Sequence, residues 1–139
     1  MLGVLVIEDN EADIELLRLS FSRGVAETMQ VKRDVASAQS WLHEQWTEHR
    51  QLPRLILLDL NLPGRSGHEL LDALKADADF RAVPVVVLSS SAHRDHIKQA
   101  LAEGANSYVC KPVELDQFRQ SVAAIEAFWL GAACIVEVG

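Results

Sequence analysis

The sequence predicts an α/β protein built on a parallel β-sheet, and two observations support this fold class. Short apolar runs recur along the chain, as at residues 2–7, 55–58 and 85–88, and each run ends in polar or charged residues. A stretch with apolar residues at helical spacing follows each run, so strand and helix alternate five times. Short continuous apolar runs are typical of strands that are buried on both faces. Right-handed crossovers between parallel strands then place helices on both faces of the sheet.

The expected strands differ in how strongly the sequence indicates them. They fall at residues 2–7, 29–35, 55–58, 85–88 and 107–110. The first, third and fourth are continuous apolar runs, the second alternates between apolar and polar residues, and the fifth is the short segment SYVC. Pro53 and Pro84 precede the third and fourth strands and separate them from the helices before them.

The expected helices have candidate caps at several ends. They fall at residues 11–23, 37–49, 67–78, 94–103 and 114–130. Asn10, Ser37 and Ser66 are of the residue types that cap helix N-termini, and they stand at the start of the first three helices. Gly24 and Gly104 follow the first and fourth helices, where glycine commonly ends a helix.

Composition and charge limit the possible classes of function. The chain of 139 residues has a formal net charge of −7, which disfavours binding to nucleic acid or to anionic membranes. No apolar run approaches the roughly 20 residues of a membrane-spanning helix, and the start lacks the pattern of a signal peptide. The two cysteines do not make a disulfide framework or a metal cluster. We therefore expect one cytoplasmic domain with free thiols.

Polar residues follow four of the expected strands. Glu8 and Asp9 follow the first strand, Asp59 the third, Ser89 the fourth and Lys111 the fifth. Because the carboxyl ends of parallel strands lie at one edge of a sheet, these residues can meet in one cleft. Three carboxylates together are costly unless a cation neutralises them, and oxygen ligands suit Mg²⁺. The sequence therefore predicts a magnesium site at this edge.

The same set of residue types suits phosphoryl transfer to a carboxylate. Lys111 supplies a positive charge for one phosphoryl oxygen, and Ser89 offers a hydroxyl donor to another. The transition state of such a transfer needs positioning and charge neutralisation more than covalent assistance. We expect Asp59 to be the reactive carboxylate. Taken alone, Asp59 could be a turn or cap residue, and Glu8 and Asp9 could be a solvated helix start.

Four motifs, in this order, resemble the receiver domain of two-component response regulators. They are GVLVIEDNE, LILLDLNLPGRSG, PVVVLSSS and SYVCKP, and the resemblance covers roughly residues 3–130. It implies a flavodoxin-like (βα)5 fold, a doubly wound parallel sheet with strand order 2-1-3-4-5. It also implies a regulator that accepts a phosphoryl group from a phosphohistidine of a sensor histidine kinase, with Mg²⁺ as cofactor. Such a protein catalyses only its own phosphorylation and dephosphorylation, so we do not expect an enzyme.

The resemblance assigns roles to the residues of the metal site. Asp59 takes the position of the phosphoacceptor, and Glu8 and Asp9 take that of the acidic pair that holds Mg²⁺. Asp59 and the backbone carbonyl of Asn61 complete the protein ligands in the family. The pair is Glu-Asp where Asp-Asp is more frequent, a change that keeps both carboxylates.

The resemblance also assigns the groups that respond to the phosphoryl group. Ser89 takes the position of the switch hydroxyl, where threonine is more frequent, and Lys111 that of the phosphate-binding lysine. Tyr108 takes the position of the switch aromatic residue, although a half-buried tyrosine would pack there in any case. The bond between Lys111 and Pro112 would be a cis peptide bond.

The C-terminal end carries more apolar residues than a receiver fold usually covers. We expect residues 1–131 to form the receiver domain and residues 132–139 to be a tail that belongs to a dimer interface. This end resembles the small single-domain regulators that pair with phytochrome-type histidine kinases and form homodimers through the last helix and tail. A tail that folds back on its own domain is the alternative. The candidate interface residues are Phe118, Val122, Ile125, Phe128 and Trp129.

Two other functions fit parts of the sequence. A receiver fold could act as a dimerising adaptor without phosphorylation, but the intact acceptor, acidic pair, Ser89 and Lys111 disfavour this. A Mg²⁺-dependent phosphohydrolase usually has a second aspartate two residues after its nucleophile, where this chain has Asn61.

His93 and His96 could face a metal together, but no further ligand supports such a site. Too few residues follow the receiver for an output domain, so we expect output through changed protein–protein contacts.

Overall fold

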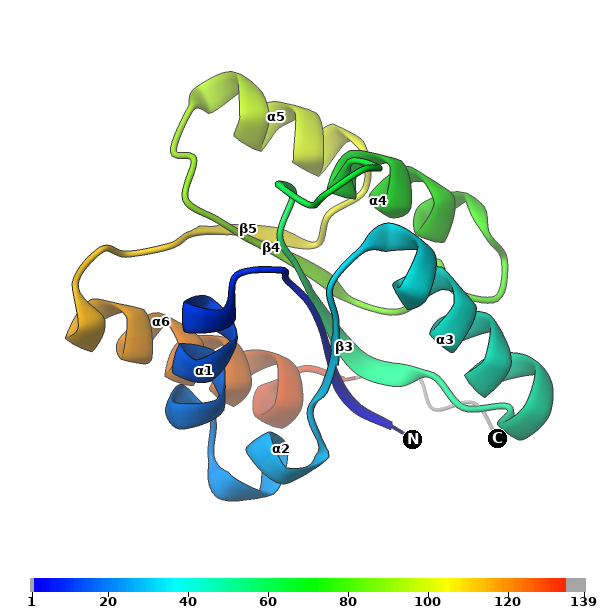
Figure 1. Ribbon diagram of the computed structural model, residues 1–139, viewed down its shortest axis with the longest axis horizontal. Coiled ribbons are helices and arrows are strands. Elements are labelled where there is room, and N and C mark those ends of the chain that lie inside the picture. The colour runs from blue at the N-terminus through cyan, green and yellow to red at the C-terminus, as the bar shows by residue number, and fades with distance from the viewer. Residues whose placement is uncertain (1, 135–139) are drawn as a thin grey trace.

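The computed structural model describes residues 2–134 and contains one parallel β-sheet with helices on both faces (Figure 1). The strand order β2-β1-β3-β4-β5 confirms the order that the sequence predicts. The strands are β1 (Leu2–Ile7), β2 (Gln30–Lys32), β3 (Pro53–Leu58), β4 (Val85–Ser89) and β5 (Ser107–Cys110). The apolar tail residues Ile135, Val136 and Val138 lie outside the described residues.

The helices form two layers around the sheet. Figure 1 shows α1, α2 and α6 on one face and α3, α4 and α5 on the other. Within residues 2–134, no helix has both the length and the apolar character that crossing a membrane requires. The helices are α1 (Glu11–Ser20), α2 (Arg23–Thr28), α3 (Val35–His49), α4 (Gly67–Ala76), α5 (Arg94–Ala102), α6 (Leu115–Ala127) and the π-helix η1 (Phe128–Ala132).

Alternate residues of the central strands pack into two separate cores. In β1, Leu5 and Ile7 belong to the core that α3, α4 and α5 cover, whereas Val4 and Val6 belong to the core under α1 and α6. The apolar residues of β3 and β4 alternate between the two cores in the same way. A strand that is buried on both faces needs an apolar residue at every position, which explains the continuous apolar runs of the sequence.

The hydrogen-bond ladder continues beyond the strands and fixes the backbone of the polar residues that follow them. The N–H of Asp59 donates to the carbonyl of Ile7 at 3.0 Å, and the N–H of Lys111 donates to the carbonyl of Ser89 at 2.7 Å. The N–H of Glu8 donates in the same way to the end of β2, at 3.0 Å. These residues therefore leave the sheet from one edge with fixed backbone positions.

The segment between β1 and β2 contains a short helix, α2, that the sequence did not predict. The predicted helix 11–23 ends at Ser20, and the predicted strand 29–35 is reduced to three residues. A distant contact holds the start of α2, since Glu126 Oε1 accepts a hydrogen bond from the N–H of Ser22 at 2.7 Å. The two residues are 104 positions apart, so no local pattern contains this contact.

Three helix starts test the predicted caps. The side chains of Asn10 and Ser66 cap α1 and α4, which confirms both predictions. In α3 the cap is Asp34 and not Ser37, because the Asp34 carboxylate accepts a hydrogen bond from the N–H of Ser37 at 2.7 Å. The helix therefore begins at Val35.

The apolar stripe of α6 packs against the sheet of its own chain. Phe118, Val122 and Ile125 are at most 5% exposed and belong to the core with β1, β3 and β4. The prediction that these three residues lie in a dimer interface is therefore wrong, because the sheet already covers them. At the end of the helix, Trp129 packs against the same core, whereas Phe128 is 53% exposed.

We expect Phe118→Ala to lower the free energy of unfolding by about 3–5 kcal/mol, because it leaves a cavity in the core between α6 and the sheet. The matched control on the same helix is Leu115→Ala, which truncates a side chain of a residue that is 45% exposed and should change stability by less than about 1 kcal/mol. Urea unfolding followed by circular dichroism measures both values. Equal effects of the two substitutions would contradict the buried position of Phe118.

Candidate functional site

Three carboxylates meet where β1 and β3 end. Glu8 and Asp9 follow β1, Asp59 follows β3, and an oxygen from each lies within 4.8 Å of the others. Glu8 and Asp59 are buried, and Asp9 is exposed. This is the convergence that the sequence predicts. Carboxylate oxygens at this spacing, with one side open to water, fit Mg²⁺, which prefers oxygen ligands and keeps several water molecules.

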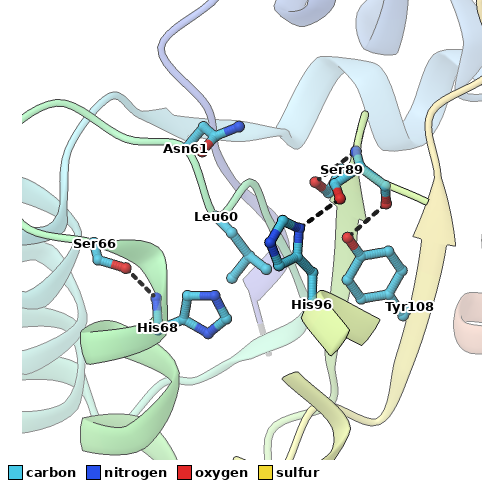
Figure 2. Close-up of a pocket in the computed structure, with 8 residues that line it drawn as sticks. Leu60, Asn61, Ser66, His68, Ser89, His96 and Tyr108 are labelled. Atoms are coloured by element: carbon cyan, nitrogen blue, oxygen red, sulfur yellow. Dashed lines mark hydrogen bonds between the residues drawn. The ribbon is translucent and has the colours of Figure 1, made fainter. Parts of the chain in front are cut away.

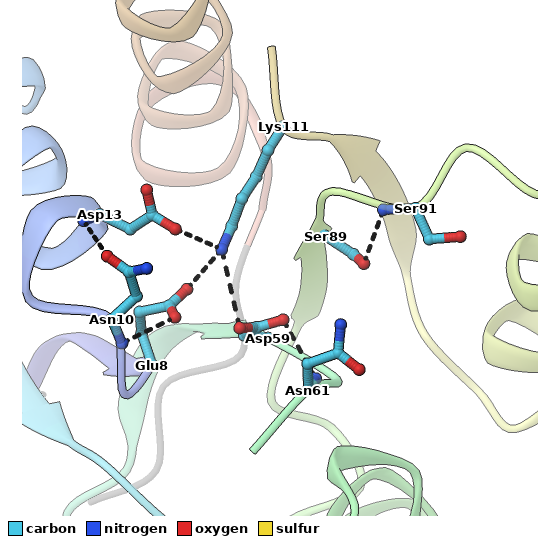
Figure 3. Close-up of polar contacts among 8 residues, drawn as sticks. All are labelled: Glu8, Asn10, Asp13, Asp59, Asn61, Ser89, Ser91 and Lys111. Atoms are coloured by element: carbon cyan, nitrogen blue, oxygen red, sulfur yellow. Dashed lines mark hydrogen bonds and ion pairs between the residues drawn. The ribbon is translucent and has the colours of Figure 1, made fainter. Parts of the chain in front are cut away.

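Backbone groups orient the two buried carboxylates (Figure 3). The N–H of Asn10 donates to Glu8 Oε1 at 3.1 Å, and the N–H of Asn61 donates to Asp59 Oδ1 at 3.1 Å. Both donors stand two residues after the carboxylate that they hold, so the turn after each strand fixes its own side chain. Asn61 therefore orients the Asp59 carboxylate through its N–H. The resemblance assigns a second role to the same residue, because it gives the carbonyl of Asn61 to the metal.

Lys111 supplies the positive charge of the site. Its Nζ lies 2.7 Å from Glu8 Oε2, 2.8 Å from Asp13 Oδ2 and 3.7 Å from Asp59 Oδ2. Burial acts to lower the pKa of Lys111, but the hydrogen bonds to Asp13 and Glu8 and the charge of Asp59 outweigh it and raise the pKa. The lysine therefore stays charged and neutralises part of the carboxylate cluster.

The predicted cis bond between Lys111 and Pro112 is not present, because no peptide bond among the described residues is cis. This prediction is wrong. The trans form of a bond before proline is favoured by about 0.5–1 kcal/mol. With the trans bond, the Lys111 side chain reaches the carboxylates of β1 and α1, so ion pairing here does not require the cis form.

Glu8 is the most perturbed acid of the site. Its burial raises the pKa to about 7 from 4.5, and the negative charge of Asp59 adds to this rise, while the hydrogen bond and charge of Lys111 oppose it. In addition, the three carboxylates of the cluster face a single ammonium group, that of Lys111. A divalent cation would relieve this excess, which is a further reason why the residues fit Mg²⁺.

A close backbone contact holds α4 against the loop after β3. A Cβ atom on Gly67, the first residue of α4, would stand 2.7 Å from the carbonyl oxygen of Asp59 and from Cα of Leu60. Only glycine permits this approach without a shift of the backbone that carries Asp59. Gly67 is therefore part of the framework of the site.

A hollow of about 190 Å³ opens beside Ser89, with His96 and Tyr108 also in its lining (Figure 2). Ser91 connects the groups around it. The N–H of Ser91 donates to Ser89 Oγ at 3.2 Å, and the Ser91 carbonyl accepts from the hydroxyl of Tyr108 at 2.7 Å. Ser91 Oγ also bonds His96 Nδ1 at 2.6 Å. The backbone of Ser91 therefore links the Ser89 hydroxyl to the Tyr108 hydroxyl. The remaining lining residues are Leu60, Asn61, Ser66 and His68.

The sequence did not indicate two of these contacts. No role in the site was assigned to Asp13 from the sequence, and its pairing with Lys111 depends on how α1 lies relative to the segment after β5. Ser91 also had no assigned role, since only Ser89 was named from the sequence at the end of this strand. His93 and His96 have ring centroids 4.9 Å apart, but no third ligand joins them: in residues 2–134 the group of three possible metal ligands is the carboxylate cluster.

This fold and site define a receiver-type protein, and comparison with known families agrees. The response regulator receiver domain family matches residues 4–123. The chain therefore belongs to the response regulator receiver domain family.

Several known proteins resemble the chain over most of their length. It is 37% identical to the probable methanogenesis regulatory protein FilR2 of Methanothrix harundinacea, over 92% of this chain and 83% of that protein. It is 34% identical to the response regulator Rcp1 of Synechocystis, over 91% of this chain and 88% of that protein. The chain is thus a response regulator of two-component signalling.

Solved structures place it near phytochrome response regulators. The phosphorylated cyanobacterial phytochrome response regulator RcpA has a TM-score of 0.89 at 36% identity, over 97% of this chain and 98% of that chain. The Mn²⁺-bound form of Rcp1 has a TM-score of 0.85 at 30% identity, over 99% of this chain and 100% of that chain. The chain is related in sequence and fold to these regulators.

The raised pKa of Glu8 predicts how stability depends on pH without metal. Between about pH 4.5 and 7 the folded chain binds the proton of Glu8 more tightly than the unfolded chain does, so stability falls as the pH rises. We expect the wild type to lose on the order of 1–3 kcal/mol across this range in the presence of a chelator. Glu8→Gln should remove most of this loss.

Urea unfolding at several pH values between 5 and 8 measures this dependence. Other groups titrate in the same range, so the quantity to compare is the difference between wild type and Glu8→Gln at each pH. Glu15→Gln removes an exposed carboxylate from α1 and should keep the wild-type slope. A slope that Glu8→Gln leaves unchanged would contradict the raised pKa.

Proposed function

We propose that this response regulator accepts a phosphoryl group on Asp59 from a phosphohistidine of a sensor histidine kinase. The observation that carries the proposal is the meeting of Asp59 with Glu8, Asp9 and Lys111 at the edge of the sheet. The phosphorylated state of the related RcpA and the Mn²⁺-bound state of the related Rcp1 support it.

In this mechanism an oxygen of the Asp59 carboxylate attacks the phosphorus of the phosphohistidine. The N–P bond breaks, its electron pair leaves with the imidazole, and an acyl phosphate forms on Asp59. The N–H of Asn61 keeps the carboxylate oriented, and Lys111 balances charge on the phosphoryl oxygens. Mg²⁺, held by Glu8, Asp9 and Asp59, would neutralise the developing negative charge.

The new negative charge would then change the contacts of β4 and β5. The Ser89 hydroxyl, which now accepts from the N–H of Ser91, would turn to donate to a phosphoryl oxygen. Ser91 loses that contact, and its carbonyl is the acceptor for Tyr108. The surface around residues 85–115 would repack, and the signal would pass to a partner through this changed surface.

The remaining proposals concern organisation and partners. Residues 1–131 would form the receiver domain and residues 132–139 a tail at a homodimer interface. The exposed Phe128, next to the half-buried Trp129, supports an interface at the end of α6.

The likeness to phytochrome response regulators supports a phytochrome-type kinase as the partner, and such a system would act in the cytoplasm. The intact carboxylate cluster disfavours an adaptor that works without phosphorylation.

Incubation with Mg²⁺ and a small acyl phosphate such as acetyl phosphate tests the acceptor directly. We expect the intact mass to rise by one phosphoryl group, because the site contains the nucleophile and the charges that the transfer needs. Asp59→Asn should abolish the increase, since the amide is a poor nucleophile. Asp72→Asn, at an exposed position on α4, is the matched control and should keep it. Failure of the wild type to gain mass would overturn the proposed function.

The oligomeric state tests the proposed interface. At micromolar concentration we expect a dimer, and Phe128→Glu should shift it to the monomer, because a charge would enter an apolar contact. Leu101→Glu places the same charge on exposed α5 and should leave the dimer intact. Sedimentation analysis measures both variants. A wild-type monomer would count against the interface, whereas phosphorylation of Asp59 would be unaffected.

A further inference from the structure

The Lys111 ammonium group lies closer to two of its three acidic neighbours than to the third. Its Nζ is within hydrogen-bond distance of Glu8 and Asp13, at 2.7 and 2.8 Å, but 3.7 Å from Asp59. Figure 3 shows the three carboxylates around the end of this side chain. The lysine side chain is only 10% exposed, so water competes little for these contacts.

Asp13 differs from the other two carboxylates in its place in the fold. Glu8 and Asp59 belong to the cluster that suits a divalent cation, and Asp13 stands outside that cluster. It lies in the first turn of α1, where its N–H donates to the capping oxygen of Asn10 at 3.0 Å. The cap fixes the backbone of Asp13, and the carboxylate is held toward Lys111 from a rigid element. A cation on the cluster would engage Glu8, but it would leave Asp13 paired with Lys111.

We propose that Asp13 is a positioning residue that holds the Lys111 ammonium group away from Asp59 and competes with the phosphoryl group for it. This inference rests on the proposed function. To bind a phosphoryl oxygen on Asp59, Lys111 has to weaken its contact with Asp13. Asp13 therefore lowers the affinity of the site for the phosphoryl group and favours return to the unphosphorylated state.

Binding of beryllofluoride in the presence of Mg²⁺ tests this inference, because beryllofluoride imitates a phosphoryl group on a carboxylate without being hydrolysed. We expect Asp13→Asn to bind it about fivefold more tightly than the wild type, since Lys111 is then free to pair with the ligand. Asp13→Glu keeps the charge and should stay within about twofold of the wild type. An NMR titration of the backbone amides gives the dissociation constants and shows that each variant is folded.

Two controls separate competition for Lys111 from other effects. Glu15→Gln removes the same charge from α1 at an exposed position and should change the affinity by less than about twofold. In a Lys111→Met background, Asp13→Asn should have no effect, because the group that both carboxylate and ligand need is absent. Asp13→Ala serves as a second variant should the asparagine variant fail to fold.

The outcomes distinguish this inference from the proposed function. Tight beryllofluoride binding by the wild type with no gain in Asp13→Asn or Asp13→Ala would overturn the inference and leave the phosphoacceptor role intact. A gain that persists in the Lys111→Met background would also overturn it, since the effect would not pass through the lysine. A wild type that binds no beryllofluoride and takes up no phosphoryl group would overturn both.

Discussion

The balance of charge at one edge of the sheet is the constraint on which the site depends. The carboxylates of Glu8, Asp9 and Asp59 converge there, and the buried charge that opposes them is the ammonium of Lys111. Burial, with the negative charge of Asp59 beside it, raises the pKa of Glu8 to about 7. The grouped carboxylates fit a divalent cation. The buried charge lowers the stability of the folded chain when no cation is bound, a cost that is common at functional sites.

The sheet makes this concentration of charge possible by holding the backbone rather than the side chains. Hydrogen bonds continue the parallel ladder to Asp59 and Lys111, one residue beyond β3 and β5. The central strands β1, β3 and β4 are buried on both faces and pack into two separate cores, so a change of register would move their apolar residues out of place. Repulsion among the acids acts on side chains that extend from fixed points, and the turn amides of Asn10 and Asn61 then set their orientation.

The sequence predicts the strands and the convergence of the polar residues because these follow from local patterns and the geometry of parallel sheets. The strand order was predicted from the resemblance to receiver domains. The sequence does not predict α2, since Glu126 holds the start of that helix from the other end of the chain. The pairing of Asp13 with Lys111 was missed for the same reason. The apolar stripe of α6 has one periodicity whether a sheet or a second subunit covers it, so Phe118 was assigned to a dimer interface although the sheet buries it. The periodicity of an apolar stripe does not say which surface covers it, and only the packing in the structure shows that the sheet does so here.

The contact between Glu126 and Ser22 has a consequence for synthesis on the ribosome. The N-terminal region emerges first, but the core between β1 and α1 is closed only by α6, and the start of α2 acquires its partner only when residue 126 has left the exit tunnel. Until then an apolar face of the growing sheet stays open to water and to chaperones. The contacts that complete this core therefore join residues far apart in the sequence, and the core can close only once α6 has been synthesised.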